Sequence, residues 1–172
     1  DMTNEKIQMN DDMRIVHGTI GDGKTLAAVE AECFPPAEAA SEEDILARLQ
    51  VYPEHFWLLY QGDELVSFIN GMVTDEPDLA DEMYENAKMH QENGRWQMIF
   101  GVNTVPSCRK KGYAGRLLEQ VIADARAQGR AGVVLTCKEK LLDYYGKFGF
   151  VNEGISRSVH GNAVWYQMRL TF

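Results

Sequence analysis

A strand, a polar loop and an amphipathic helix follow one another between residues 96 and 127, and this unit constrains the fold most. Residues 96–105 carry no charge and end at Pro106, which predicts a buried strand. Residues 113–127 repeat apolar side chains at the spacing of one helix face: Ala114, Leu117, Leu118, Val121, Ile122 and Ala125. A buried strand that leads into such a helix is typical of α/β domains.

The rest of the chain supplies further strands and helices. Apolar alternation and turn residues predict strands at 13–20, 56–60, 65–73, 133–137, 150–156 and 163–170. Helices are predicted at 25–34, from 41–44 onward, and at 141–148. The acidic segment 74–93 is either a helix or a mobile excursion. We therefore expect one α/β domain with a mixed sheet over residues 13–172, preceded by a disordered segment over residues 1–12.

Charge excludes one class of partner and divides the chain in two. The 172 residues have a net charge of −9, which argues against nucleic-acid binding. Residues 1–100 hold 21 acidic and 6 basic residues, whereas residues 101–172 hold 5 acidic and 11 basic. This asymmetry indicates either two partners of opposite charge or simply two solvated faces.

Cysteine and histidine spacing indicates neither a disulfide framework nor a metal site. The three cysteines are odd in number and widely spaced, and the four histidines show no ligand pattern. The sequence also shows no signal peptide and no run of about 20 apolar residues. We therefore expect a cytoplasmic protein without a metal or a membrane partner.

The loop at 107–116 carries the chemistry. The first amides of a helix have no internal partner and lie at the positive end of its dipole. Gly112, Ala114 and Gly115 leave the backbone accessible, while Arg109 and Lys111 belong to the basic residues around it. This arrangement predicts a phosphate site, although a glycine-started helix with surface lysines would look similar. It is neither a P-loop nor a Gly-x-Gly-x-x-Gly motif.

Two motifs resemble the GNAT superfamily of N-acetyltransferases. Arg109-x-x-Gly112-x-Ala114 is similar to the family's Gln/Arg-x-x-Gly-x-Gly/Ala motif, and residues 145–150 are similar to its Tyr-x-x-x-Gly-Phe motif. Residues 66–71 and 75–76, Cys137 and the tail from 154 to 168 resemble the arylalkylamine (serotonin) N-acetyltransferase branch. Residues 35–41 resemble its microbial relatives, so that the resemblance extends from about residue 14 to the C-terminus.

The resemblance implies a GNAT-like fold, a mixed and mostly antiparallel sheet with helices on both faces, and acetyl-CoA as cosubstrate. In the family, the strand before the loop splays from its neighbour and contacts the pantetheine arm. The residues that would bind the cofactor are Val102, Asn103, Thr104, Lys110, Lys111, Gly112, Tyr113, Ala114, Gly115, Thr136 and Tyr145. By the resemblance, Tyr145 matches the tyrosine that usually serves as the family's general acid. A phenol stays protonated at neutral pH, which suits a proton donor. The alternative is an aromatic core residue.

At the positions of the general base, this sequence differs from the animal branch. The two histidines of that branch correspond here to Met98 and Phe100. By residue type alone, Glu32, Glu38 and His160 are candidates. The acidic front half would attract a cationic amine. Phe34, Phe56, Trp57 and Trp96 either supply aromatic surface for an aryl group or a cation, or are core residues.

Three functions follow from these observations. The first is acetyl transfer from acetyl-CoA to a small arylalkyl- or polyamine. The second is a non-catalytic acyl-CoA sensor that has lost its base. The third is acetylation of a protein lysine or N-terminus. The sequence leaves open whether the chain is a monomer or a homodimer.

Overall fold

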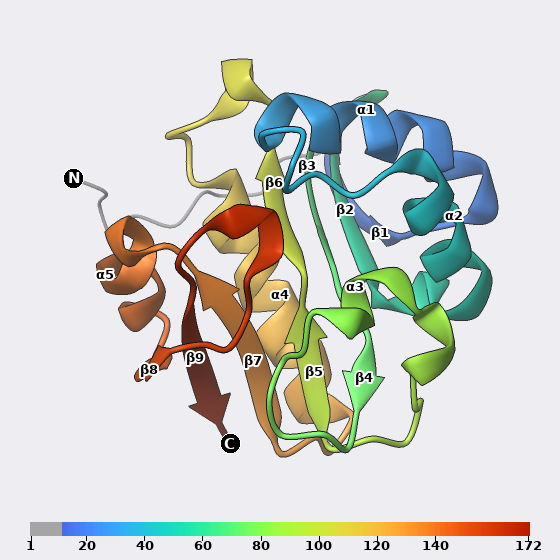
Figure 1. The fold of residues 1–172 in the computed structure, drawn as a ribbon. Helices are drawn as coiled ribbons and strands as arrows, with labels where there is room; N and C mark the ends of the chain where they lie inside the picture. The colour runs from blue at the N-terminus through green and yellow to red at the C-terminus, as the bar shows by residue number, and fades with distance from the viewer. Residues whose placement is uncertain (1–11) are drawn as a thin grey trace.

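The computed structural model describes residues 12–172, which form two sheets flanked by helices (Figure 1). The strands are β1 (Met13–His17), β2 (Phe56–Gln61), β3 (Glu64–Asn70), β4 (Val73–Thr74), β5 (Trp96–Ile99), β6 (Gly101–Thr104), β7 (Gly132–Cys137), β8 (Val151–Ile155) and β9 (Tyr166–Thr171). The helices are α1 (Gly23–Cys33), α2 (Glu42–Val51), α3 (Glu82–Glu85), α4 (Tyr113–Ala127) and α5 (Leu142–Gly146).

The two sheets meet where β5 and β6 follow one another. One sheet has the order β1-β2-β3-β6 and the other the order β4-β5-β7-β9-β8. β5 and β7 pair in parallel, whereas the other neighbours are antiparallel. The expected mixed, mostly antiparallel sheet is therefore confirmed. β6 is an edge strand that pairs with β3 alone, so the layer opens between β6 and β7 (Figure 1).

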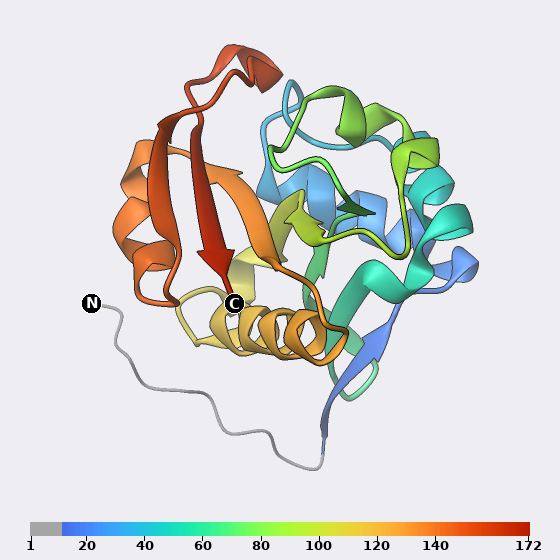
Figure 2. The same cartoon turned by 90° about the horizontal axis from the view of Figure 1, so that it is seen from below.

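Helices cover both faces of the strands, as expected (Figure 2). On one face α4 buries Leu117, Leu118 and Val121 in a cluster that includes Trp57 and Leu135. On the other, α1 and α2 pack a second cluster that includes Leu26, Leu49, Phe68, Met98 and Val134. Each large apolar side chain that is fully buried contributes about 1.5–3 kcal/mol. The strands are thus fixed from both sides, and the opening between β6 and β7 has rigid walls.

The predicted strand 96–105 is interrupted at Phe100. The amide of Phe100 donates to the carbonyl of Asn70 at 2.8 Å, and the residues after it pair with β3 instead of β7. Alternation alone does not reveal this change of partner, since the sequence stays apolar through it. The break is what separates β6 from β7.

Other predictions differ in their extent. The acidic segment 74–93 contains the short helix α3 and, after Asn86, a single turn at Ala87–Met89, with irregular chain on either side. The first strand ends at His17, three residues earlier than predicted. The expected disordered segment at 1–12 lies outside the described residues, apart from residue 12. Within residues 12–172, no helix combines the length and apolarity needed to cross a membrane.

Candidate active site

A cleft of about 1850 Å³ extends from the loop before α4, past β6 and β7, to α1 and α3. Val102 and Thr104 of β6 line one wall, and Thr136 of β7 lines the other. Figure 1 shows the two strands diverging, with α4 behind the opening. The predicted splay of the strand before the loop is therefore present.

The loop before α4 presents backbone amides to one end of the cleft. Gly112 precedes the helix with φ +84° and Lys110 has φ +63°, both in the left-handed region. The amide of Arg116 is bonded to the carbonyl of Gly112, so the amides of residues 113–115 precede the first such bond. The Tyr113 side chain points into the core, where its hydroxyl donates to Gln61 at 3.2 Å. Tyr113 can therefore offer a ligand its backbone but not its phenol.

Basic side chains surround this end of the cleft. The residues concerned are Arg109, Lys110, Lys111, Arg116, Lys140 and Lys147. Arg109 Nε donates to the Thr104 carbonyl at 3.2 Å, which ties the loop to the end of β6. Free amides, a helix dipole and clustered cations together fit the phosphates of coenzyme A. This end corresponds to the basic half of the sequence.

Tyr145 lies in the wall of the cleft on α5. It is 6% exposed, and its ring meets those of Tyr144 and Phe150 edge-on. Burial raises the pKa of Tyr145 above its ordinary value, so the phenol is fully protonated at neutral pH. Its position suits either a proton donor in the cleft or a packing residue.

The opposite end of the cleft is acidic and aromatic. Asp44, Asp81, Glu82 and Glu85 line it together with Tyr84. The Tyr84 hydroxyl lies 3.4 Å from that of Thr136, and burial raises the pKa of Tyr84 to about 12. The acidic half of the sequence therefore contributes to the cleft and is not only a solvated face.

The loop before β9 closes this end. His160 stacks on Tyr84 with ring centroids 4.7 Å apart, and its Nε2 donates to the Glu38 carbonyl at 2.8 Å. The Glu38 carboxylate pairs with Lys138 at 2.8 Å. Lys138 Nζ in turn lies 5.6 Å from the centre of the Trp165 ring. Of the three candidate bases, Glu38 and His160 thus line the cleft, and each has one atom bonded, Oε2 of Glu38 and Nε2 of His160, while the buried Oε1 of Glu38 has no partner among the described residues.

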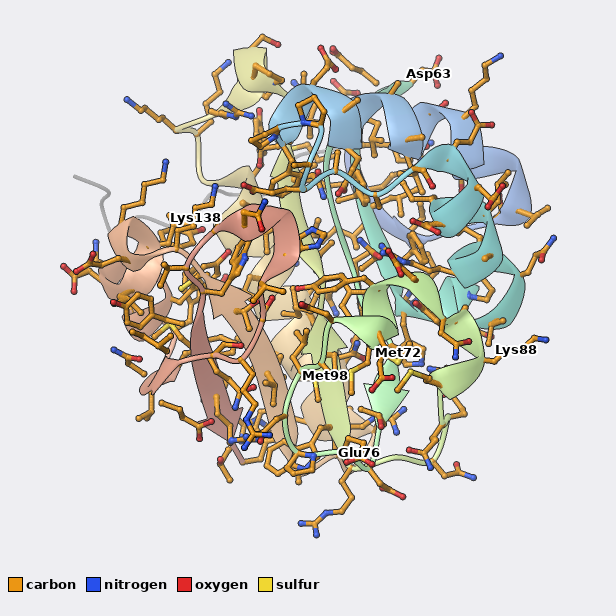
Figure 3. All side chains as sticks on the ribbon, in the orientation of Figure 1. Asp63, Met72, Glu76, Lys88, Met98 and Lys138 are labelled. Carbon is orange, nitrogen blue, oxygen red and sulfur yellow. The ribbon has the colours of Figure 1, made fainter. Side chains whose placement is uncertain are left out.

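The remaining candidates are placed differently. Glu32 is exposed on α1 and is not part of the cleft lining. Met98 is fully buried against Met72, away from Lys138 and the cleft (Figure 3). Phe100 does line the cleft, and the Arg48 guanidinium lies 4.9 Å from the centre of its ring. Only one of the two positions that carry histidine in the animal branch therefore faces the cleft.

The sequence reasoning missed Glu30 and Arg48. Both are charged but buried: Arg48 donates to Asn70 Oδ1 at 2.9 Å and to the Tyr84 carbonyl at 2.8 Å. Glu30 follows Leu26 by four residues, on the face that α1 buries. An acid on the apolar face of a helix was the available signal. Asn103, expected at the cofactor, has its side chain buried and contributes no lining to the cleft.

One group of potential metal ligands lies outside the cleft. The ligand atoms of His55, His90 and Glu92 lie within 4.8 Å of one another, which the spacing in sequence did not indicate. The Val73 amide donates to His90 Nδ1, so the ring proton is on Nε2, which donates to Glu92 at 2.8 Å. His90 Nε2 therefore has no lone pair for a cation while these bonds are present.

The split sheet and the basic loop at the start of a helix define the architecture of an acetyltransferase. A sequence model of the acetyltransferase (GNAT) family matches residues 24–150, and the chain belongs to that family.

Solved structures show the same fold. The loading GNATL domain of CurA from Lyngbya majuscula is 20% identical with a TM-score of 0.79, covering 92% of this chain and 97% of that one. The GphF GNAT-like decarboxylase in complex with isobutyryl-CoA is 22% identical with a TM-score of 0.80, covering 92% and 98%. The PaiA N-acetyltransferase from Thermoplasma acidophilum in complex with coenzyme A is 16% identical with a TM-score of 0.68, covering 93% and 99%.

Proposed function

We propose that the protein transfers the acetyl group of acetyl-CoA to a small primary amine, with Tyr145 as general acid. The observation that carries the proposal is one continuous cleft with a basic helix start at one end and acidic, aromatic walls at the other. The two ends suit a phosphate-bearing donor and a cationic acceptor. The relatives of this fold include a structure with coenzyme A bound.

The residues at the basic end would hold acetyl-CoA. The amides of residues 113–115 and the side chains of Lys110 and Lys111 would bind phosphates, while Val102, Thr104 and Thr136 would flank the pantetheine arm. Acetyl-CoA supplies a thioester carbonyl that an amine can attack. Tyr145 would donate its hydroxyl proton to the sulfur that leaves.

The acidic end would bind the acceptor. Asp44, Glu82 and Glu85 raise the local concentration of a cation near the cleft. The rings of Tyr84, Phe100 and Trp165 offer aromatic surface. The resemblance to the arylalkylamine branch supports an aryl group on the amine. The carboxylates of Asp44, Glu82 and Glu85 support a second ammonium group.

The test is thiol release from acetyl-CoA in the presence of single amines. We expect release with 2-phenylethylamine or putrescine that saturates with the amine. Acetyl-CoA binding by calorimetry without any amine-dependent release would contradict the proposal and support a sensor. Acetylation of peptides but not of free amines would instead identify a protein acetyltransferase.

A further inference from the structure

Glu30 on α1 is a buried carboxyl group in the wall of the cleft. It is 6% exposed, and its Oε2 accepts the amide proton of Ala40 at 3.0 Å. Its Oε1 is buried and has no hydrogen-bond partner among residues 12–172. Buried polar atoms in proteins nearly always have a partner, because an unpaired one is costly. The free oxygen therefore points to a group that the cleft receives.

Asn103 on β6 adds two more unpaired atoms. Its side chain is fully buried, and neither its Oδ1 nor its Nδ2 makes a hydrogen bond of ordinary geometry among the described residues, although the Asn103 side chain faces the Glu30 carboxylate and acts to lower its pKa. Both residues adjoin Gly101, which has no side chain. We call the part of the wall formed by Glu30, Phe34 and Gly101, with the Asn103 side chain buried behind it, the Gly101 niche.

The Gly101 niche depends on the absence of a side chain at Gly101. A Cβ placed on Gly101 would lie 3.3 Å from Asn103 Nδ2, 3.7 Å from Glu30 Oε1 and 3.8 Å from Phe34 Cε2. The first of these contacts is tight, so a side chain here would crowd its neighbours. Without one, a nitrogen in the cleft can approach Glu30 Oε1 across Gly101, next to an apolar ring edge.

The Gly101 niche opens on the acceptor side of the strand. Along β6, Val102 packs against the cluster under α4, whereas Gly101 and Asn103 are buried on the side that faces α1. Glu30, Phe34 and Gly101 line the same cleft as Tyr145 and Thr136. The niche thus adjoins the acidic end and not the phosphate loop.

We propose that the Gly101 niche binds the reacting nitrogen of the acceptor amine and that Glu30 is the base that accepts its proton. This inference rests on the proposed function, because it assigns the acceptor half of the same reaction. Of the other candidates, Glu32 lies outside the cleft. Glu38 also has a buried oxygen without a partner, Oε1, but its Oε2 is paired with the Lys138 ammonium, which stabilises the carboxylate and weakens it as a base. His160 donates its Nε2 proton to the Glu38 carbonyl, so only its Nδ1 could accept a proton.

The surroundings of Glu30 tune it as a base. Burial raises its pKa above the usual value, and the Ala40 amide and the charge of Arg48 oppose this rise. The other titratable groups that act on it or feel its charge are Cys33, Tyr84 and His160. A carboxylate with a raised pKa is a stronger base, because the difference between its pKa and that of an alkylammonium is smaller.

The proton balance of the reaction is complete with two residues. The ammonium R–NH3+ gives one proton to the Glu30 carboxylate, which later releases it to water. The nitrogen lone pair then forms the C–N bond at the acetyl carbonyl carbon, and the C–S bond breaks. Tyr145 protonates the departing thiolate and recovers a proton from the nitrogen as the amide forms. The products are R–NH–CO–CH3, coenzyme A thiol and one proton.

The experiment compares Glu30→Gln with Glu32→Gln, an identical change two residues away on the exposed side of α1. At pH 7 we expect Glu30→Gln to lower kcat/KM for 2-phenylethylamine or putrescine by about 100-fold or more. The dissociation constant of acetyl-CoA should not change. The deficit should shrink above pH 9, where a larger fraction of amine is already neutral. Glu32→Gln should behave as the wild type throughout.

Gly101→Ala gives a second readout that does not depend on the carboxyl. The added methyl fills the Gly101 niche, so KM for the amine should rise while the affinity for acetyl-CoA stays constant. A Glu30→Gln variant that folds and matches Glu32→Gln at every pH would overturn the niche and leave the proposed function intact.

A wild type without amine-dependent thiol release would overturn the proposed function instead. The niche is then tested by infrared difference spectroscopy of the carboxyl bands on adding 2-phenylethylamine or putrescine. A difference signal that Glu30→Gln removes would support the niche, and its absence would overturn it.

Discussion

The two ends of the cleft are built in different ways. The basic end is made mainly of consecutive residues, 109–116, which act through backbone amides and adjacent charges. The acidic end brings together Glu30, Asp81 and His160, which lie far apart in the chain. A site that binds phosphates through one loop tolerates many side chains, whereas an acceptor site depends on each of its side chains.

The largest expected effect after Glu30→Gln is at Tyr145, between the two ends. Tyr145→Phe keeps the ring contacts with Tyr144 and Phe150 but removes the hydroxyl. We expect kcat to fall about 100-fold, because the thiolate loses its proton donor. Acetyl-CoA affinity should change little. Steady-state kinetics with pre-steady-state bursts would show whether chemistry limits turnover.

Tyr144→Phe is the matched control for that variant. Its ring is next to Tyr145, and its hydroxyl lies 3.7 Å from the point where a Cβ on Gly115 would be. Loss of this hydroxyl should leave kcat within about twofold, because Tyr145 is then intact. Equal kcat for Tyr145→Phe and the wild type, with chemistry limiting, would leave Tyr145 a packing residue.

The contrast between the ends also explains what could be predicted from sequence. The helix 113–127 and its loop follow from local spacing and glycine chemistry, and the structure contains them where expected. The change of partner at Phe100 depends on the pairing of Asn70 with distant residues, which no local pattern records. Glu30 could have been noticed as an acid on the buried face of α1, but its surroundings come from α2, β6 and the loop before β9, which the local pattern does not record.

A smaller effect is expected at the basic end. Lys111→Glu reverses one exposed charge beside the amides of α4. We expect acetyl-CoA to bind roughly fivefold more weakly at low ionic strength, which corresponds to about 1 kcal/mol for an exposed charge interaction. The difference should diminish as salt is added. Calorimetry at two ionic strengths measures both quantities.

Lys88→Glu makes the same charge change at an exposed residue that does not line the cleft (Figure 3). It should leave acetyl-CoA affinity nearly unchanged at either ionic strength. If Lys88→Glu weakened binding as much as Lys111→Glu, net charge rather than the loop would govern affinity. Neither variant should alter the KM for the amine by more than about twofold, since the acceptor end is untouched.

The smallest effect lies outside both ends and concerns acid stability. Glu92 bonds to His55 and His90 and pairs with Arg130 at 3.3 Å. Burial acts to raise the pKa of Glu92, but its hydrogen bonds to His90 and His55 and the charge of these histidines outweigh this effect and lower it. Burial lowers the pKa of His90. The folded state therefore binds protons at Glu92 and His90 less readily than the unfolded state does. The Glu92 contribution is complete above pH 4.5 and is lost as pH falls through its lower folded pKa.

Glu92→Gln should accordingly lower Tm by about 1–3 °C at pH 7, and the difference should vanish well below pH 4.5. Glu76→Gln, an exposed acid elsewhere in the same acidic segment, should have no effect (Figure 3). His90 is common to both variants, so stability should also fall in both as pH drops below 6.5. Because neither Glu92 nor Glu76 lines the cleft, both variants should match the wild type in kcat and acetyl-CoA affinity at pH 7. If the acidic side of the pH–activity profile shifted in Glu92→Gln, the loss of activity at low pH would reflect unfolding. If it shifted only in Glu30→Gln, the loss would reflect protonation of the base.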